Sequence, residues 1–310
     1  MATPLAPEAD WIRVRVSGKI NLALRVGAVR PNGYHPLATV FQSVSLFDEV
    51  GVRWDEPGRF TVSVAGDQAD LVPSDGNNLA VKAAKLLADH YGPHRLGAEI
   101  TIRKTIPVAG GMAGGSADAA GALLACSVLW DLDTSPDDLR GFGAKLGADV
   151  PFQLMGGTAF GTGRGDQLVP VLSRGSYHWV LALSEDELST PAVFRRFDEF
   201  NPEAPDDLPL PNEVMNALVA GDAVALGDAL INDLEPAAAS MRPGLVRVLE
   251  TGRELGALGA VVSGAGPTCA FLAANEAAAV DLSVQLSSEG LCRAVRRVTG
   301  PVPGARLITA

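Results

Sequence analysis

Apolar and polar residues alternate along the first part of the chain. Apolar positions recur at every second residue over 12–16 and again over 20–26, which is the period of a β-strand with one buried face. Because residues two apart share a strand face, Lys19 and Asn21 are expected to lie together, opposite the apolar side chains. Further strands are expected over 38–46, 50–54, 60–64 and 98–106.

Helices are predicted where apolar residues return after three or four positions. The first such pattern follows Asn77 and forms one helical face. A second helix is expected to begin at Ser135, because Pro136 follows it and Asp138 completes a capping-box pattern. That helix is expected to end at Gly147. Later, helices are expected over 190–200, with Thr190 as the cap, and over 275–287, with short helices before 256 and strands over 178–183, 259–263, 268–272 and 292–298.

The order of these elements favours an α+β fold. Hairpin-like strands come first and helices later, whereas a doubly wound parallel sheet needs the two to alternate. A chain of 310 residues is longer than one hydrophobic core usually supports, so two domains are expected. Glycine is dense from about residue 156, and the composition changes over 165–176. We therefore predict one domain over 1–172 and a second over 173–310.

The charge balance narrows the range of partners. The chain has 25 Lys+Arg against 36 Asp+Glu, a net charge of −11, which disfavours nucleic-acid polymers, anionic membranes and, at first sight, polyphosphates. The three cysteines lie far apart, which argues against a disulfide framework or a zinc site. Residues 1–10 lack a secretory signal and are expected to form a loose tail, and no apolar run predicts a membrane span. A cytoplasmic location is expected.

The most informative segment is a glycine-rich turn between a predicted strand and a predicted helix. Gly110, Gly111, Gly114 and Gly115 precede Ser116, which is expected to open an alanine-rich helix. Glycine lets a backbone approach a phosphate closely, and the N–H groups at a helix start attract anions. The spacing matches neither a Walker A loop nor a dinucleotide fingerprint. We interpret the segment as a phosphate-binding loop; the alternative is a flexible turn before a helix.

Several other positions have both a functional and a structural interpretation. Lys19 is either part of a polar site or a solvated strand lysine. Asp149 is either a helix cap or a carboxylate among apolar neighbours, suited to accept a proton from a hydroxyl. Tyr34 and His35 follow a turn, where they either bind a ring or form a surface pair. The small-residue turn over 263–268 is either a hairpin loop or part of a site.

Taken in order, three segments resemble the three motifs of the GHMP kinases, the family of galactokinase and of homoserine, mevalonate and phosphomevalonate kinases. These segments are 17–22, 107–118 and 263–269. Three more resemble the branch of that family whose acceptor is a methylerythritol unit carried on cytidine diphosphate: Asn32-Gly33-Tyr34-His35, Leu146 to Phe152, and Thr190 to Phe194. The resemblance spans roughly 12–300, with Met112-Ala113 and Ala117 standing where Leu-Gly and Ser are commoner.

The resemblance implies a two-domain GHMP-kinase-like α+β fold. Its N-terminal ATP-binding and catalytic domain would contain a left-handed βαβ crossover, and its C-terminal domain would be ferredoxin-like. It also implies transfer of the γ-phosphoryl group of ATP, with Mg²⁺, to the 2-hydroxyl of that cytidine-diphosphate-bearing small molecule, in the non-mevalonate route to isoprenoids.

The same resemblance implies roles for individual residues. Lys19 and Asp149 match the family's catalytic pair. The substrate-binding residues are matched by Asn21, Tyr34, His35, Thr190 and Phe194. The ATP phosphates are expected on Pro107, Val108, Ala109, Gly110, Gly111, Met112, Ala113, Gly114, Gly115, Ser116 and Ala117. Since residue 117 is alanine, Ser116 is left as the loop hydroxyl, and no protein ligand of the metal ion is assigned.

Two rival functions stay open. One is another GHMP kinase, such as a homoserine or mevalonate type; the Asn-Gly-Tyr-His segment with Thr190 and Phe194 argues against it. The other is a non-catalytic sensor on the same fold, which would be expected to lack Lys19 and Asp149. The net charge of −11 then excludes broad electrostatic capture, but not one local phosphate site built from backbone donors. The oligomeric state is not predicted.

Overall fold

The computed structural model describes residues 11–92 and 94–308, so the tail expected over 1–10 lies outside the described residues. The larger of two sheets contains β1 (Ile12–Val26), β2 (Leu37–Trp54), β3 (Phe60–Gly66), β4 (Ala98–Lys104), β5 (Thr158–Thr162), β6 (Gln167–Pro170), β8 (Ile231–Asn232) and β12 (Arg306–Leu307). The smaller sheet contains β7 (Tyr177–Leu183), β9 (Gly259–Val262), β10 (Cys269–Ala273) and β11 (Ala294–Gly300).

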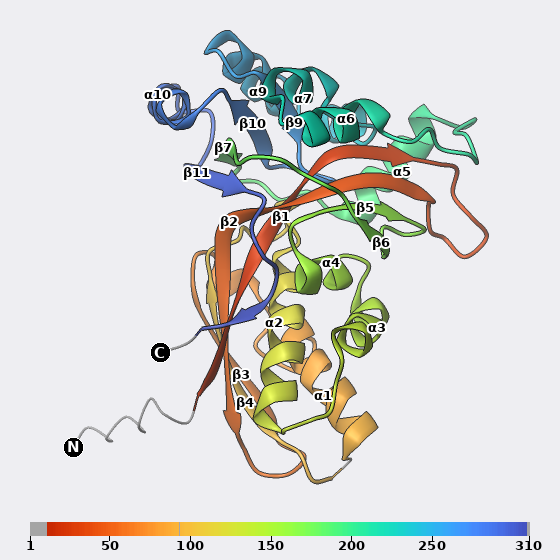
Figure 1. Cartoon of the computed structure of the whole chain (residues 1–310), viewed down its shortest axis with the longest axis vertical. Helices are drawn as coiled ribbons and strands as arrows, with labels where there is room; N and C mark the ends of the chain where they lie inside the picture. The colour runs from red at the N-terminus through yellow and green to blue at the C-terminus, as the bar shows by residue number, and fades with distance from the viewer. Residues whose placement is uncertain (1–10, 93, 309–310) are drawn as a thin grey trace.

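The helices divide between the two sheets. Those before the smaller sheet are η2 (Ala69–Leu71), α1 (Leu79–Tyr91), α2 (Gly114–Leu129), α3 (Pro136–Leu146) and α4 (Val150–Met155). Those that follow β7 are α5 (Thr190–Phe200), α6 (Asn212–Ala220), α7 (Ala223–Ala229), α8 (Glu235–Met241), α9 (Gly244–Glu254) and α10 (Glu276–Ser288). Figure 1 shows α1 to α4 beside the larger sheet and α6, α7, α9 and α10 around the smaller one, which confirms a mixed α+β fold with two parts.

The first two strands are longer than the sequence pattern predicts. The segments expected over 12–16 and 20–26 form one strand, and so do those expected over 38–46 and 50–54. Their antiparallel pairing shifts register between Ser17 and Gly18 and again between Asn21 and Ala23, as happens where a bulge adds one residue. Within the larger sheet, both strands extend as far as the helices of the second part (Figure 1). Their middle portions are therefore covered on both sides.

Helix α2 packs against β1 and β2 and against α1. Most of its residues are small and buried, which lets the helix lie close to the sheet. It begins at Gly114, two residues before the predicted start at Ser116, because Ala113 already holds the left-handed conformation of the turn. The structure therefore adds two glycines to the first helical turn.

The helix-start signals were predicted with mixed success. The capping box of Ser135 and Asp138 is present, and Gly147 follows the last residue of α3, as expected. The helix expected after Asn77 begins at Leu79, and Asn78 caps it. Helix α5 starts at Thr190 itself with Ser189 before it, so the prediction of Thr190 as the cap is wrong. A Pro at the second helical position is as favourable sterically as one at the first, which is why the pattern misplaced the start by one residue.

The glycine-dense stretch after residue 156 folds as a hairpin that the sequence pattern does not predict. Strands β5 and β6 pair antiparallel, and β5 also pairs with β2. Gly163 and Gly165 in the turn have positive φ angles, which glycine adopts without a steric penalty. The hairpin thereby extends the larger sheet and forms one wall of a cavity.

The second part has the topology that the family resemblance implies. Its elements follow the order strand, helices, two strands, helix, strand, and its antiparallel sheet is ordered β11-β7-β10-β9. This is the ferredoxin-like arrangement. In the first part, β3 and β4 are parallel and joined through α1, which supplies the expected βαβ unit; its left-handedness stays a prediction.

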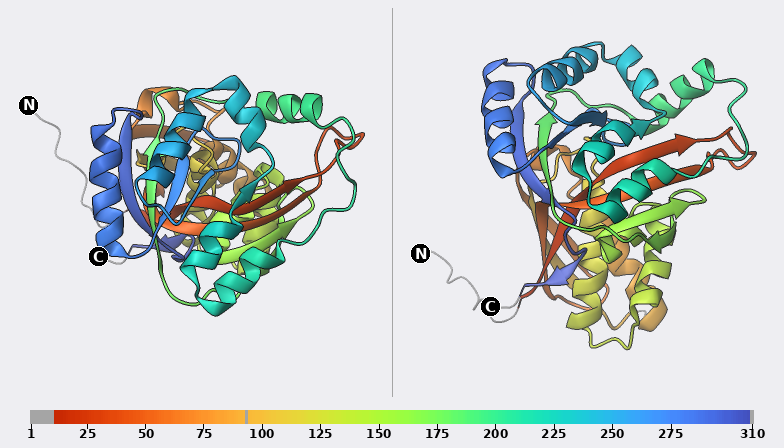
Figure 2. Two further views of the ribbon diagram at one scale, coloured as in Figure 1. Left: turned by 90° about the horizontal axis from the view of Figure 1, so that it is seen from above. Right: turned by 45° about the horizontal axis from the view of Figure 1, so that its top comes forward.

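The two parts share strands of the larger sheet. Strand β8, which lies between α7 and α8, pairs in parallel with β1, and β12 near the end of the chain pairs with the same strand. Figure 2 shows the two parts from two further directions, with the later helices beside the ends of β1 and β2. The proposed division at residues 172 and 173 falls in the connection between β6 and β7. No helix in residues 11–92 or 94–308 is long and apolar enough to cross a membrane.

Candidate active site

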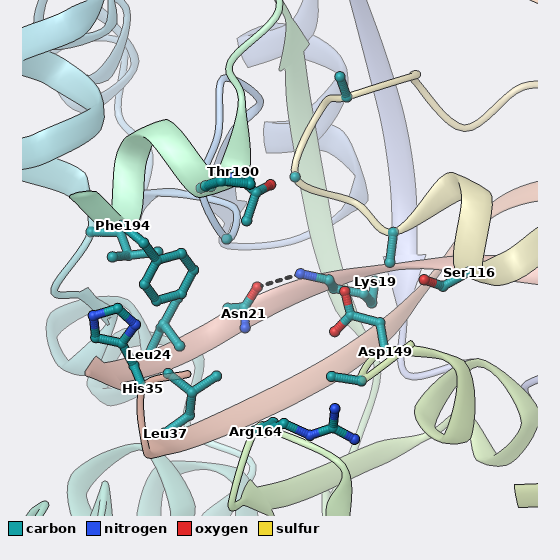
Figure 3. Close-up of a pocket in the computed structure, with 18 of the residues that line it drawn as sticks. Lys19, Asn21, Leu24, His35, Leu37, Ser116, Asp149, Arg164, Thr190 and Phe194 are labelled. Atoms are coloured by element: carbon teal, nitrogen blue, oxygen red, sulfur yellow. Dashed lines mark hydrogen bonds between the residues drawn. The ribbon is translucent and has the colours of Figure 1, made fainter. Parts of the chain in front are cut away.

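A cavity of about 690 Å³ lies where the two parts of the molecule meet. Its wall is formed by β1, the glycine-rich loop before α2, the start of α4, the β5–β6 hairpin, α5 and the turn before β10. The volume suits a small-molecule ligand. Figure 3 draws 18 of the residues that line the cavity.

The three motif segments meet at this cavity. The N–H of Lys19 donates to the carbonyl of Met112 (3.3 Å), and the Ser263 hydroxyl donates to the carbonyl of Gly111 (3.0 Å). Gly111 has a φ of +76°, and a Cβ added there would lie 2.0 Å from the Ser263 carbonyl oxygen. Only glycine fits so close an approach. The turn over 263–268 is therefore joined to the glycine-rich loop and is more than an isolated hairpin loop.

The glycine-rich loop presents the start of α2 to the cavity. Gly114, Gly115 and Ser116 form the first turn of the helix and line the cavity. The N–H groups of a first helical turn have no partner within the helix, so they are available to an anion. The arrangement has the chemistry of a phosphate site.

Eight of the eleven loop residues predicted to bind ATP line the cavity, and three do not. Those that line it are Pro107, Ala109, Gly110, Gly111, Ala113, Gly114, Gly115 and Ser116. Met112 and Ala117 are completely buried in the core. The N–H of Val108 donates to the Gln68 side chain (3.0 Å). These three residues therefore support the conformation of the loop from the side that faces away from the cavity.

Lys19 is a buried cation at the edge of the cavity. Only 4% of the residue is exposed, and its ammonium donates to Oδ1 of Asn21 (2.7 Å), as Figure 3 shows. Asn21 in turn donates to the Thr39 hydroxyl (2.9 Å), which donates to a backbone carbonyl. Burial lowers the pKa of Lys19 below its ordinary 10.5, and the nearby carboxylate of Asp149 opposes this only in part.

Asp149 directs its carboxylate into the cavity. The residue stands at the start of α4, yet its side chain makes no capping hydrogen bond to the helix. Figure 3 shows the carboxylate turned toward Lys19, with Ser116 beyond. The sequence left a choice between a helix cap and a functional carboxylate. The geometry favours the functional one, because a carboxylate beside a buried ammonium can accept a proton from a bound hydroxyl.

Aromatic side chains gather at the other end of the cavity. His35 and Phe194 have ring centroids 4.8 Å apart, and Tyr34 is 53% exposed at the cavity edge. Nε2 of His35 lies 2.7 Å from Oδ1 of Asp198. All five predicted substrate-binding residues, Asn21, Tyr34, His35, Thr190 and Phe194, line the same cavity. The structure thus brings together segments that are far apart in the sequence.

Sequence reasoning missed three polar residues of this site. Asp198 lies one helical turn after Phe194 on α5, a spacing that could have revealed it. Asn232 donates to the carbonyls of Val262 (2.7 Å) and Gly264 (2.8 Å) and so holds the turn that faces Lys19. Arg164 lies in the hairpin that the pattern did not predict. Neither Arg164 nor Asn232 carries a local signal in the sequence.

Comparison with known proteins matches the two parts to one family. The description "GHMP kinases N terminal domain" matches residues 78–157, and "GHMP kinases C terminal" matches residues 214–291. A relative from Rhodococcus jostii named 4-diphosphocytidyl-2-C-methyl-D-erythritol kinase is 54% identical over 296 residues, 95% of this chain and 94% of the relative. The chain belongs to the GHMP kinase family.

Other relatives and solved structures agree with this assignment. A Cutibacterium acnes protein with the same name is 50% identical over 96% of this chain and 97% of its own length. A crystal structure of 4-(cytidine 5'-diphospho)-2C-methyl-D-erythritol kinase is 31% identical, with a TM-score of 0.74, and covers 92% of this chain and 98% of that one. Homoserine kinase from Cytophaga hutchinsonii has a TM-score of 0.76 at 17% identity, covering 99% and 100%, which shows the shared fold alone.

This GHMP kinase contains a second buried lysine, behind the glycine-rich loop. The ammonium of Lys104 donates to Asp48 and to Asp118 (2.8 Å). Asp48 also accepts hydrogen bonds from the N–H groups of Thr105 (2.6 Å) and Ile106 (2.9 Å). Because Asp118 belongs to α2, the cluster ties the end of β4 to the helix on the far side of the loop.

The side chains of the cavity offer few ligands for a metal ion. Within the described residues of this GHMP kinase, no group of three His, Cys, Asp or Glu side chains could hold one. Asp118 hydrogen-bonds Lys104 and Asp198 hydrogen-bonds His35 at the aromatic end, so the Asp149 carboxylate and the Ser116 hydroxyl are the donors near the glycine-rich loop. This donor set fits Mg²⁺, which commonly keeps several waters and binds through one carboxylate and the phosphates of a nucleotide.

Proposed function

We propose that this GHMP kinase transfers the γ-phosphoryl group of ATP to the 2-hydroxyl of 4-diphosphocytidyl-2-C-methyl-D-erythritol. The reaction belongs to the non-mevalonate route to isoprenoid precursors. The observation that carries the proposal is one cavity with a phosphate loop, a Lys–Asp pair and an aromatic end. The names of the relatives at 50% identity or more support the choice of acceptor.

Asp149 and Lys19 would act on the acceptor hydroxyl. Phosphoryl transfer asks the protein mainly for positioning and for stabilisation of charge. Asp149 accepts the hydroxyl proton as the oxygen attacks the γ-phosphorus, and the bond from that phosphorus to the β-phosphate oxygen breaks, so that ADP leaves. The Lys19 ammonium stabilises the ionised carboxylate and the developing negative charge on the oxygen. Asn21 orients the ammonium through its 2.7 Å hydrogen bond.

The two ends of the cavity would hold the two nucleotides. The ATP phosphates lie on the N–H groups at the start of α2, where no helical partner competes for them. The cytidine ring lies among Tyr34, His35 and Phe194, which offer stacking area and an imidazole for hydrogen bonding. Thr190 lines the wall between these ends. With both ligands in place, the hydroxyl and the γ-phosphate meet at Asp149.

Asp149 and Ser116 are the residues that would hold Mg²⁺ together with the ATP phosphates. When bound, the ion supplies charge neutralisation on the phosphates. The backbone donors of the loop and Lys19 add to this locally, which reconciles a phosphate site with a net charge of −11. The same negative charge supports a small-molecule partner over a nucleic-acid polymer. The free thiols of Cys126, Cys269 and Cys292 support a reducing, cytoplasmic location.

A substrate panel tests the proposal. Release of ADP is measured with ATP and, in turn, the cytidine-diphosphate-linked methylerythritol, homoserine and mevalonate. The cytidine-linked alcohol should be the substrate that gives rapid turnover. Preference for homoserine or mevalonate would reassign the enzyme within the family, and binding without turnover of any of them would indicate a sensor.

A variant tests the role of the base. Asp149→Asn keeps the shape of the side chain and should lower kcat by about 10²–10⁴-fold, because the amide cannot accept the proton. Asp198→Asn, a carboxylate of the same cavity outside the proposed reaction centre, serves as the matched comparison and should retain kcat within about tenfold. Near-wild-type turnover of Asp149→Asn would remove Asp149 from the mechanism.

A further inference from the structure

Arg164 is a cation in the wall of the cavity, and it takes no part in the proposed phosphoryl transfer. It lies in the turn between β5 and β6, and 37% of its side chain is exposed. Figure 3 shows its guanidinium extending along the wall opposite Lys19, toward the side of the cavity where Asp149 lies. A position so close to the proposed reaction centre calls for a functional explanation.

The guanidinium is held in place from one side. Its Nε and Nη2 donate to Oδ2 of Asp166 (3.1 and 2.6 Å), and Nη2 also donates to the carbonyl of Ala144 in α3 (3.3 Å). Asp166 is itself fixed, because its other oxygen accepts the N–H of Arg164 (3.2 Å). Within the described residues, the acceptors of the guanidinium are Asp166 and Ala144, and the Tyr34 side chain, which is 53% exposed, also interacts with it. The orientation is therefore set from the Asp166 side, while the opposite edge faces the cavity beside Tyr34, where no carboxylate or carbonyl of the described residues competes for it.

Arg164 also touches the aromatic end of the cavity. Its guanidinium carbon lies 5.1 Å from the centroid of the Tyr34 ring, within range of a cation–π contact. The residue thus spans the region between Tyr34, where a base would stack, and Asp149, where a hydroxyl would react. A ligand that occupies both positions must place the group that links base and alcohol beside Arg164.

We infer that Arg164 binds the diphosphate of a nucleoside-diphosphate-linked acceptor. The inference deepens the proposed function and rests on it, because that acceptor has a diphosphate between its base and its alcohol. A planar guanidinium pairs with phosphate oxygens through directional, charge-assisted hydrogen bonds. Since Asp166 and Ala144 already order the side chain, little conformational entropy is lost when the phosphates bind. Asp149 and Asp198 line the same cavity, so a cation here also offsets their repulsion of the diphosphate.

Binding of two probes separates this role from simple support of Tyr34. Calorimetry measures the Kd of CDP and of cytidine for the wild-type protein and for Arg164→Met, which keeps an apolar stem without donors. The Kd of CDP should rise by about 10- to 100-fold, the range for loss of hydrogen bonds to a charged group. The Kd of cytidine should change by less than about threefold, and the KM for ATP should stay the same.

Two further variants serve as controls for the effect of Arg164→Met on CDP binding. Arg196→Met removes an ion-paired arginine with 43% of its side chain exposed that does not line the cavity, and it should bind CDP as the wild type does. Arg164→Lys keeps the charge but loses the planar fork, so it should recover part of the CDP affinity. Thermal unfolding of each variant establishes that the fold is intact.

Three results would overturn the role assigned to Arg164. They differ in whether the proposed function also fails. If Arg164→Met weakens CDP and cytidine equally, Arg164 acts by supporting Tyr34. If the wild type binds CDP and Arg164→Met binds it as tightly, the diphosphate lies elsewhere, and the proposed function stands. If the wild-type protein neither binds CDP nor phosphorylates the cytidine-linked alcohol, the proposed function fails and the assignment fails with it.

Discussion

Two lysines of the larger sheet are equally buried, yet their surroundings are opposite. Lys19 is 4% exposed and Lys104 is 3% exposed. Lys19 donates to a neutral amide, that of Asn21, and has Asp149 as its nearby carboxylate. Lys104 donates to two carboxylates, those of Asp48 and Asp118. One cation is thus incompletely compensated, whereas the other is surrounded by negative charge.

The pKa directions follow from this difference. Burial lowers the pKa of Lys19, and Asp149 does not restore it. Burial acts on Lys104 in the same direction, but Asp118 and Asp48 outweigh it and hold its pKa above 10.5. A buried ammonium that lacks enough nearby negative charge is stabilised most strongly by a bound phosphate. The comparison therefore supports the proposed role of Lys19 in binding phosphate, and it favours a structural role for Lys104.

The largest expected effect is on stability, from Lys104→Met. The change leaves two buried carboxylates facing each other, so the free energy of unfolding should fall by about 3–5 kcal/mol. Urea unfolding at neutral pH measures it. Lys19→Met is the matched control and should lower the free energy of unfolding by less, because removal of a poorly compensated buried charge offsets the hydrogen bond lost to Asn21. An equal loss from both variants would erase the distinction between the lysines.

The next effect is on turnover, from Lys19→Met. Loss of the ammonium removes the charge that stabilises the developing oxyanion, so kcat should fall by about 10²–10³-fold. ADP release measures it, with the exposed Lys82→Met as the control. If Lys19→Met turned over within about threefold of the wild type, Lys19 would be structural like Lys104.

A smaller effect is expected from Gly264→Ala, beside Lys19. Gly264 has a φ of +56°, and an added Cβ would lie 3.1 Å from the Lys19 ammonium. The left-handed backbone alone should cost about 1–2 kcal/mol of unfolding free energy, and displacement of the ammonium should reduce kcat as well. Gly290→Ala is the control for backbone strain, since its φ is +63° but nothing lies near its Cβ. Equal kcat values in the two variants would show that turnover does not depend on the exact position of the Lys19 ammonium.

The smallest effect is a pH dependence at the Lys104 cluster. Burial, with repulsion from Asp48, raises the pKa of Asp118 from 3.8 to about 7 despite the attraction of Lys104. The stability contributed by its protonation is complete below the unfolded-state pKa and is lost as the pH rises through about 7.

Asp118→Asn, which cannot titrate, removes that dependence. The variant should gain about 1 kcal/mol relative to the wild type as the pH rises from 6 to 7. Urea unfolding at both pH values measures the gain. Parallel stability curves for the two proteins would mean that Asp118 stays ionised throughout.

Residues that act within short segments could be predicted from the sequence. The capping box of α3, most of the strands and the glycine-rich loop depend on neighbours a few positions away, and each has a local signal. Lys19, Asp149, Tyr34 and His35 are candidates from the residue pattern alone, but the choice between a functional and a structural role depends on the resemblance to a known family, which also adds Phe194. Their convergence on one cavity is a property of the fold, to which the resemblance only pointed.

Residues defined by distant partners could not be predicted. Lys104 sits in an alternating strand, and its partners Asp48 and Asp118 are 56 and 14 residues away, so nothing local marks it as buried. The β5–β6 hairpin was missed because its glycines suggest a loop, whereas β2 pairs with β5 and imposes the strand. Arg164 was missed along with the hairpin. Tertiary pairing overrode local propensity at each of these positions.

The pKa values of the two lysines test the central claim most directly. NMR titration of the protein with labelled lysine side chains can follow both ammonium groups, with the Lys19→Met and Lys104→Met variants used to assign the signals. The account predicts a pKa below 10.5 for Lys19 and above 10.5 for Lys104. Addition of an ATP analogue should raise the pKa of Lys19 and leave that of Lys104 unchanged. A Lys19 pKa at or above 10.5 that does not respond to the nucleotide would contradict it.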